Sequence, residues 1–332
     1  MALLDKLPGD HLNLYIGGLF TLRRRDALRT ANITHVLSVL RLPLDKALFD
    51  PFHHMVVEVD DVDDEDLLHH FPNVIRFIQA GLDAGGGVLV HCAMGKSRSA
   101  TCVMAYLMHK YRISPAEALS HVRLARSICE PNDGFMKQLE IYHRMNMTDN
   151  VDESPEYQRW VYQREVEFSR ACGQAPEADK IRFEDEHNKE AQAELELRCR
   201  KCRRPLATSA FITQHPSGDH AGARPVASNC SHYFIDPLSW MRPELEQGKL
   251  DGRFECPKCR TNVGKYAWQG MRCNCGDWVV PAISLAKGRI DEVRKRAGTT
   301  EQAAGIRRPP GLAPTAPSGA ETSNKPPGLG NL

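Results

Sequence analysis

The sequence has no long apolar run, few aromatic residues and almost no net charge. Among its 332 residues, Phe, Trp and Tyr together make up 7%, and the formal net charge is +1. No segment approaches the roughly 18 consecutive apolar residues that a membrane-spanning helix requires, so we expect no membrane association. The opening residues, MALLDKLPGDHLNLY, show no basic flank followed by an apolar core, so we also expect no secretory signal.

Cysteine, in contrast, is abundant and unevenly placed. The chain has 11 cysteines, and seven of them fall between Cys199 and Cys275. Because no secretory signal is expected, clustered cysteines with Cys-x-x-Cys spacing favour metal binding over disulfide bonds. We therefore expect a protein of the reducing compartments, the cytoplasm and the nucleus.

The small net charge conceals a strong asymmetry along the chain. The formal net charge is −7 over residues 151–196 and +9 over residues 197–296. Such a basic segment favours a polyanionic partner, such as RNA or a ribonucleoprotein, and the alternative is a solvated basic face. The last segment is rich in Pro, Gly, Ala, Ser and Thr, which predicts disorder. The composition predicts four parts: a folded domain over 1–148, an acidic, partly helical connector over 149–196, a zinc-binding domain over 197–296 and a disordered tail over 297–332.

Strand-like and helix-like segments alternate over the first 150 residues, which favours an α/β fold with a parallel-type twisted sheet flanked by helices. Pro72 lies inside a helical pattern, so we expect the main helix there to begin near it. Ser114 and Glu117 form a capping-box pattern ahead of another helix. The predicted strands cover residues 12–16, 33–40, 54–59 and 88–90, and the predicted helices cover 21–31, 66–82, 100–110, 115–125 and 132–145.

The segment VHCAMGKSRSA places Cys92 between a predicted strand and a predicted helix. Backbone N–H groups and a helix N-terminus stabilise anions at such a turn, and the same field lowers the pKa of a thiol. Arg98 carries a planar guanidinium that can bind two phosphate oxygens at once. One short segment therefore predicts a nucleophile, an anion-binding loop and a phosphate-binding cation, and a buried structural cysteine is the alternative.

Three motifs together resemble one enzyme family. HCAMGKSRS resembles the phosphate-binding loop of the cysteine-dependent protein tyrosine phosphatases, in their dual-specificity branch. DDVDDEDLLHHF resembles the loop that carries the general acid in that family, and RLARSICEPNDGFMKQL resembles the family's helix and PN-x-GF segment. The resemblance covers residues 10–145. It implies the dual-specificity phosphatase fold and hydrolysis of phosphotyrosine and phosphoserine or phosphothreonine through a phosphocysteine, with no cofactor needed for catalysis.

The resemblance also implies a role for each matched residue. Cys92 would attack phosphorus, while Arg98 and the loop amides would bind the equatorial oxygens. His91 would orient the loop, and Ser99 would donate a hydrogen bond to the sulfur. The family's spacing selects Asp61 as the general acid, with Asp60 as its main rival. The residues expected to bind the substrate phosphate are Ala93, Met94, Gly95, Lys96, Ser97 and Arg98.

The cysteine-rich segment holds three close pairs and one further thiol. Seven thiols are one short of two tetrahedral zinc sites, and a histidine is the natural eighth ligand. His215, His220 and His232 are the candidates, and the spacing does not assign ligands to one site or the other. The predicted cysteine ligands are Cys199, Cys202, Cys230, Cys256, Cys259, Cys273 and Cys275.

Three blocks of this segment resemble the C-terminal zinc domain of one dual-specificity subfamily, that of dual-specificity phosphatase twelve of animals and its fungal counterpart. The blocks are ELRCRKCRRPLATSAFITQH, NCSHYFIDPLSWM and FECPKCRTNVGKYAWQGMRCNCGDWVVPA. The resemblance favours His215 as the eighth ligand and implies two structural zinc ions. It also implies an alternative function: assembly of the large ribosomal subunit, by binding to its pre-60S precursor through the zinc domain with catalysis dispensable. The expected partners are thus phosphoprotein substrates and that precursor particle.

Overall fold

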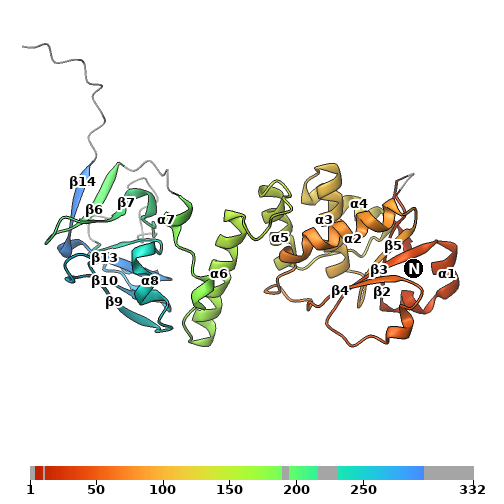
Figure 1. Cartoon of the computed structure of the whole chain (residues 1–332), viewed down its shortest axis with the longest axis horizontal. Coiled ribbons are helices and arrows are strands. Elements are labelled where there is room, and N and C mark those ends of the chain that lie inside the picture. Colours follow the sequence, from red (N-terminus) through yellow and green to blue (C-terminus); the bar gives the residue numbers. More distant parts are fainter. Residues whose placement is uncertain (1–3, 10–11, 189–193, 216–229, 295–332) are drawn as a thin grey trace, which may run out of the picture. The chain divides into compact units, whose positions relative to one another are not determined.

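The structure is a computed structural model that describes residues 4–9, 12–188, 194–215 and 230–294. Within this part of the chain, the sheet before residue 100 and the sheets after residue 194 are separate, and each region has its own apolar core (Figure 1). None of the described helices is long and apolar enough to cross a membrane. The predicted disordered tail over 297–332 and the candidate ligand His220 lie outside the described residues.

The N-terminal sheet has five strands in the order β1-β2-β5-β3-β4. Strand β1 runs antiparallel to β2, whereas β2, β3, β4 and β5 are mutually parallel. All six residues of β5 are buried, which is usual for a parallel strand covered on both faces. The strands are β1 (Leu4–Lys6), β2 (Leu14–Gly18), β3 (Ile33–Val39), β4 (His53–Val57) and β5 (Gly87–Cys92). The prediction of a mainly parallel sheet flanked by helices is confirmed.

Five α-helices accompany this sheet: α1 (Arg25–Thr30), α2 (Phe71–Asp83), α3 (Arg98–Tyr111), α4 (Pro115–Ala125) and α5 (Asp133–Arg144). The larger core lies between one face of the sheet and α2, α3, α4 and α5, and α3 is buried from Arg98 to Met108. Helix α2 carries Pro72 in its first turn, and the capping box of Ser114 and Glu117 opens α4, as predicted. The single helix predicted over 21–31 is wrong: Arg24 leaves helical geometry at φ −91° and ψ 64° and separates a 3₁₀ turn from α1.

Helix α6 (Pro155–Cys172) follows the N-terminal domain and contacts both cores. Trp160 and Val161 in its first half pack against the core of the N-terminal domain. Tyr162 and Val166 pack with the core of the residues after 194. The acidic connector is therefore helical over this stretch, with apolar contacts on both sides.

The described residues after 194 form small antiparallel sheets. The three-stranded sheet contains β14 (Ile290–Arg294), β6 (Leu195–Cys199) and β7 (Pro205–Thr208). The four-stranded sheet contains β8 (His232–Phe234), β13 (Ala282–Ala286), β10 (Asn262–Ala267) and β9 (Asp251–Glu255). The hairpin pairs β11 (Met271–Arg272) with β12 (Trp278–Val279), and α8 (Arg242–Leu245) is a single-turn helix. Another single-turn helix, α7 (Glu184–His187), precedes this region. The apolar core of this region contains the buried side chains of Trp268, Tyr266 and Phe254.

Seven 3₁₀ helices complete the described elements. They are η1 (Leu19–Arg23), η2 (Lys46–Leu48), η3 (Leu68–His70), η4 (Ala178–Lys180), η5 (Ser209–Phe211), η6 (Ser239–Met241) and η7 (Lys287–Arg289). Of these, η3 leads directly into α2, so the pattern predicted over 66–82 is a short turn followed by a regular helix. This arrangement leaves the acidic residues before Leu67 in a loop beside the carboxyl end of the sheet.

Candidate functional site

The loop between β5 and α3 carries the predicted nucleophile and the predicted phosphate-binding arginine. Cys92 is the last residue of β5, and Arg98 is the first residue of α3. Gly95, midway between them, has φ +70°, and a Cβ atom there would lie 2.4 Å from the carbonyl oxygen of Gly17. Only glycine fits this conformation and this close approach. The loop can therefore curl tightly over β2 and direct its amide groups inward.

The Cys92 thiol is buried, with 1% of the residue exposed, and it accepts hydrogen bonds from the loop. The Gly95 amide nitrogen lies 3.2 Å from the sulfur, and the Ser99 hydroxyl lies 3.4 Å from it. Burial by itself raises the pKa of a thiol. Here hydrogen bonds from the Ser99 hydroxyl and from the amides of Ser99, Lys96 and Gly95 outweigh burial and hold the pKa of Cys92 below its ordinary value. The site therefore favours the thiolate, which is the nucleophilic form.

The Arg98 guanidinium lies beside the loop with donor capacity to spare. Its Nη1 donates to the carbonyl oxygen of Val59 at 3.2 Å, and its Nε lies 3.7 Å from Oδ2 of Asp61. Among the described residues, the buried Nε has no hydrogen-bond partner. A buried donor without a partner costs free energy, and a phosphate oxygen would satisfy it. The arrangement suits a tetrahedral oxyanion between the guanidinium and the loop amides.

The structure brings Asp61, and not Asp60, to the loop. Oδ1 of Asp61 accepts hydrogen bonds from the Ser97 hydroxyl at 2.6 Å and from the Asn132 side-chain amide at 3.1 Å. Asp60 instead pairs with Arg41 at 3.2 Å, and both of these side chains are more than half exposed. Because Asp61 also lies beside Arg98, it is the carboxyl group that can reach a phosphate ester bound in the loop.

His91 is fully buried beneath the loop. Its Nδ1 faces the carbonyl oxygen of Cys92 at 3.3 Å, and its Nε2 lies 2.7 Å from the Ser38 hydroxyl. Burial lowers the pKa of His91 to about 4. The ring is therefore neutral near pH 7, which suits a residue that orients the backbone of Cys92 rather than one that transfers protons.

One buried arginine supports the loop and was not singled out in the sequence. Arg126 donates from Nε to the carbonyl oxygen of Gly95 at 2.8 Å and from Nη2 to that of Met94 at 2.9 Å, while Nη1 pairs with Asp5 at 2.5 Å. In a trans peptide the C=O and N–H groups point in opposite directions. Holding these two carbonyls behind the loop therefore directs the amides of Gly95 and Lys96 toward the Cys92 side. Arg126 lies in RLARSICEPNDGFMKQL, but nothing in its spacing indicates the contact.

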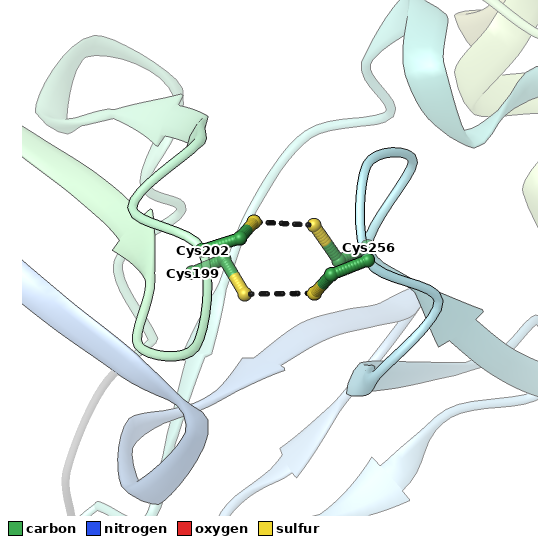
Figure 2. Close-up of side chains that lie close together, drawn as sticks. Cys199, Cys202 and Cys256 are labelled. Carbon is green, nitrogen blue, oxygen red and sulfur yellow. Dashed lines mark hydrogen bonds between the residues drawn. The ribbon is translucent and has the colours of Figure 1, made fainter.

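The predicted metal ligands form two clusters, and the first consists of four cysteines. Figure 2 shows Cys199 and Cys202 facing Cys256 across a small gap, from two separate turns. The Sγ atoms of Cys202 and Cys256 are 3.5 Å apart, and those of Cys199 and Cys259 are 3.7 Å apart. Each turn contains a residue in the left-handed region, Arg203 at φ 62° or Arg260 at φ 58°. Each tight turn places the two thiols of its Cys-x-x-Cys pair side by side, so that they face the thiols of the other pair.

The second cluster contains one histidine and three cysteines. His215 lies in it with Cys230, Cys273 and Cys275, and its Nε2 is 3.5 Å from the sulfur of Cys230 and 3.2 Å from that of Cys275. The rival candidate His232 lies outside the cluster, and its Nδ1 contacts the Ser231 hydroxyl at 2.9 Å. The structure thus groups His215 with the cysteines and leaves His232 apart.

Both clusters have the donors and the spacing of a tetrahedral metal site. In each, the four ligand atoms lie within 4.8 Å of one another. A tetrahedral zinc ion with Zn–S distances of about 2.3 Å keeps its sulfur ligands about 3.8 Å apart, close to the sulfur separations in the first cluster. The ligand pairs alternate along the chain, because 199 and 202 join 256 and 259, while 215 and 230 join 273 and 275. Each cluster could therefore hold a metal ion that ties together distant segments.

Comparisons with known proteins agree with this geometry. Residues 14–145 match the family model described as dual specificity phosphatase, catalytic domain. The chain is 36% identical to the tyrosine-protein phosphatase yvh1 of Schizosaccharomyces pombe, over 85% of this chain and 84% of that protein. It is 31% identical to human dual specificity protein phosphatase 12, over 88% of this chain and 89% of that protein.

A solved structure also aligns with the chain. The crystal structure of the Yvh1 phosphatase domain from Chaetomium thermophilum covers 44% of this chain and 99% of its own, at 40% identity and a TM-score of 0.42. The family relationship rests on these two relatives, because each alignment covers more than four fifths of this chain and of the relative. The chain therefore belongs to the dual-specificity protein tyrosine/serine/threonine phosphatases, in the group of the fungal Yvh1 proteins and animal dual specificity protein phosphatase 12.

Proposed function

We propose that the chain hydrolyses phosphate esters of tyrosine, serine and threonine in proteins through a phosphocysteine formed on Cys92. The observation that carries the proposal is the convergence of three groups on one loop. These are a thiol whose pKa is held below its ordinary value, the Nε of Arg98, which has no hydrogen-bond partner among the described residues, and the carboxyl group of Asp61 beside it. A nucleophile, an oxyanion clamp and a proton donor are what the reaction requires.

The reaction proceeds in two displacements at phosphorus. In the first, the Cys92 thiolate attacks, an S–P bond forms, and the P–O bond to the leaving group breaks as Asp61 gives that oxygen a proton. In the second, water attacks phosphorus, Asp61 accepts its proton, and the S–P bond breaks to release inorganic phosphate. Arg98 and the loop amides bind the equatorial oxygens in both steps. Ser99, whose hydroxyl lies 3.4 Å from the sulfur, stabilises the departing thiolate.

The role of Asp61 is tested by its dependence on the leaving group. With Asp61→Asn we expect kcat/KM, which reports the first displacement, to fall by about 10²- to 10³-fold for an alkyl phosphate, a poor leaving group, because its oxygen needs a proton. The loss should shrink for aryl phosphates of acidic phenols, whose phenolates leave without one. Asp60→Asn is the matched control, since Asp60 pairs with Arg41, and we expect its kcat/KM to stay within about two-fold of the wild-type value. A uniform loss across leaving groups would contradict the assignment.

We also infer that the two clusters hold structural zinc and that residues 197–296 direct the enzyme to its partners. Thiolates and imidazole are the ligands that zinc prefers, and the described donors are three or four thiols with at most one histidine. The proposed parts remain the catalytic domain over 1–148, the connector over 149–196, the zinc domain over 197–296 and the tail over 297–332.

A second candidate function is assembly of the large ribosomal subunit in the nucleus and cytoplasm. The net charge of +9 over residues 197–296 supports a polyanionic partner. Lys201, Arg204 and Lys258 are exposed on or beside the two turns of the first cluster, so cations surround one metal centre. Such a surface suits RNA or an acidic ribonucleoprotein. In this proposal binding is the main task and catalysis is dispensable.

A rescue experiment in cells that lack the protein separates the two functions. If binding is the main task, full-length Cys92→Ser restores large-subunit maturation, whereas the triple charge reversal Lys201→Glu, Arg204→Glu, Lys258→Glu does not. Lys137→Glu, which reverses an exposed charge on α5, serves as the control and should rescue fully. Maturation that depends on Cys92, with the charge reversal fully active, would reject the assembly role.

A further inference from the structure

Three hydrogen-bonded side chains cross three neighbouring strands beneath the active-site loop. They are His54 on β4, Ser38 on β3 and His91 on β5. The Ser38 hydroxyl oxygen lies 2.8 Å from Nε2 of His54 and 2.7 Å from Nε2 of His91. Ser38 and His91 are also register partners in the parallel ladder, so the sheet itself holds them side by side. Because side chains alternate along a strand, these three side chains lie on the face of the sheet opposite the Cys92 thiol.

The hydrogen bonds have one direction. His91 is neutral near pH 7, because burial lowers its pKa to about 4, so one ring nitrogen donates and the other accepts. Nδ1 faces the Cys92 carbonyl at 3.3 Å and must donate to it, so Nε2 accepts the proton of the Ser38 hydroxyl. The Ser38 oxygen then accepts from the N–H at Nε2 of His54. The series of hydrogen bonds therefore runs from the N–H of His54, through Ser38 and His91, to the backbone carbonyl of Cys92.

The surroundings leave His54 few alternatives. Its ring stacks on Phe49, with ring centroids 3.5 Å apart and an interplanar angle of 3°. Ser38 and His91 are fully buried, while His54 is half-buried at the outer end of this row of three hydrogen-bonded side chains. His54 and His91 interact electrostatically, and burial lowers the pKa of both. The next residue, His53, pairs instead with His35, with ring centroids 4.6 Å apart.

We propose that His54 is a positioning residue for the phosphatase reaction, acting on Cys92 through Ser38 and His91. The proposal rests on the assignment of Cys92 as the nucleophile. With its donor in place, the Ser38 hydroxyl is held toward His91, and His91 is held as the tautomer that binds the Cys92 carbonyl. Without that donor, the hydroxyl rotates and the His91 ring exchanges tautomers. The peptide that joins Cys92 to the loop is then less well held, and the thiolate loses part of its stabilisation.

The experiment measures the thiolate of Cys92 by the rate at which iodoacetate inactivates the enzyme, from pH 5 to pH 8. His54→Leu and Ser38→Ala should each raise the apparent pKa of the thiol by about 0.5 to 1 unit, which slows inactivation at low pH about 3- to 10-fold. The acid limb of kcat/KM should move by the same amount. His54→Gln, whose side-chain amide can donate to Ser38 from a similar position, should stay within about two-fold of wild type.

Controls separate this effect from a packing defect and from failure of the proposed function. His53→Gln changes the neighbouring histidine and should leave the pH profile unchanged. In the double variant His54→Leu, Ser38→Ala the shifts in the apparent pKa of the Cys92 thiol should not add, because both changes break the same series of hydrogen bonds. Additive shifts, an unchanged pKa in His54→Leu, or a His54→Gln profile that matches His54→Leu would overturn the inference. Wild-type enzyme that is not inactivated, or that inorganic phosphate does not protect, would instead reject Cys92 as the nucleophile.

Discussion

Replacing Cys92 by serine should abolish turnover of an aryl phosphate, with kcat/KM falling by roughly 10⁴-fold or more. His91 is not available as a general base for a serine hydroxyl in this loop, because its ring nitrogens bond to the Cys92 carbonyl and to Ser38. The loop hydrogen bonds that favour a thiolate are too weak to ionise an alcohol, whose pKa is far higher. Steady-state assays of both proteins measure the loss.

Two further measurements make this test specific to the chemistry. Acid-quenched wild-type enzyme should carry radiolabelled phosphate from the substrate on the peptide that contains Cys92, and the variant should carry none. The variant should still bind a phosphotyrosine peptide, because Arg98 and the loop amides are unchanged. Cys172→Ser, at an exposed cysteine of α6, is the matched control and should keep full activity. Retained turnover in Cys92→Ser would show that another group performs the attack.

Removal of metal should unfold the cysteine-rich domain and leave the catalytic domain active. Structural zinc supplies roughly 10–16 kcal/mol of apparent binding free energy in small domains, which is comparable to the whole stability of many of them. The first cluster lies at the ends of β6 and β9, and its Cys199 and Cys256 are part of the apolar core. Trp268, fully buried in that core, should become exposed, so its fluorescence should shift to longer wavelength.

The test compares chelation with single substitutions. Cys256→Ser should lower the metal content and expose Trp268, whereas Cys172→Ser should change neither. The purified chain should contain about two zinc ions, one for each cluster of four ligands. His232→Ala should keep both ions and His215→Ala should lose one, because His215 and not His232 lies among the cysteines. Fewer than about two ions in the wild type, or a domain that keeps its fold after chelation, would contradict the two-site interpretation.

Local sequence patterns were enough to predict much of the fold. The alternation of apolar segments predicted the parallel strands, and the capping box of Ser114 and Glu117 predicted the start of α4. These signals work because hydrogen bonds and burial within a few residues dominate them. The prediction of a single helix over 21–31 was wrong because local signals do not show every break. The apolar spacing of this segment suits a helix, but the backbone turns at Arg24 between η1 and α1.

Contacts between distant segments were out of reach of such patterns. Arg126 supports the active-site loop from 31 residues beyond Gly95, and its partner Asp5 lies 121 residues away. Gly134 shows the same limit, because a Cβ atom there would lie 1.9 Å from the carbonyl oxygen of Asp63 in the acid loop. The close approach of α5 to that loop explains the glycine, but only the folded chain shows the approach.

The sequence alone determined which chemistry this protein can carry. Cys92 and Arg98 are separated by one short loop, so their cooperation follows from local geometry, and the cysteine pairs announce metal binding by their spacing. Tertiary structure decided which partners join them. It placed Asp61 rather than Asp60 beside Arg98, grouped His215 rather than His232 with three cysteines, and linked His54 through Ser38 to His91. Each choice depends on strands and turns that meet across tens of residues, where packing and hydrogen bonding, not spacing, set the distances.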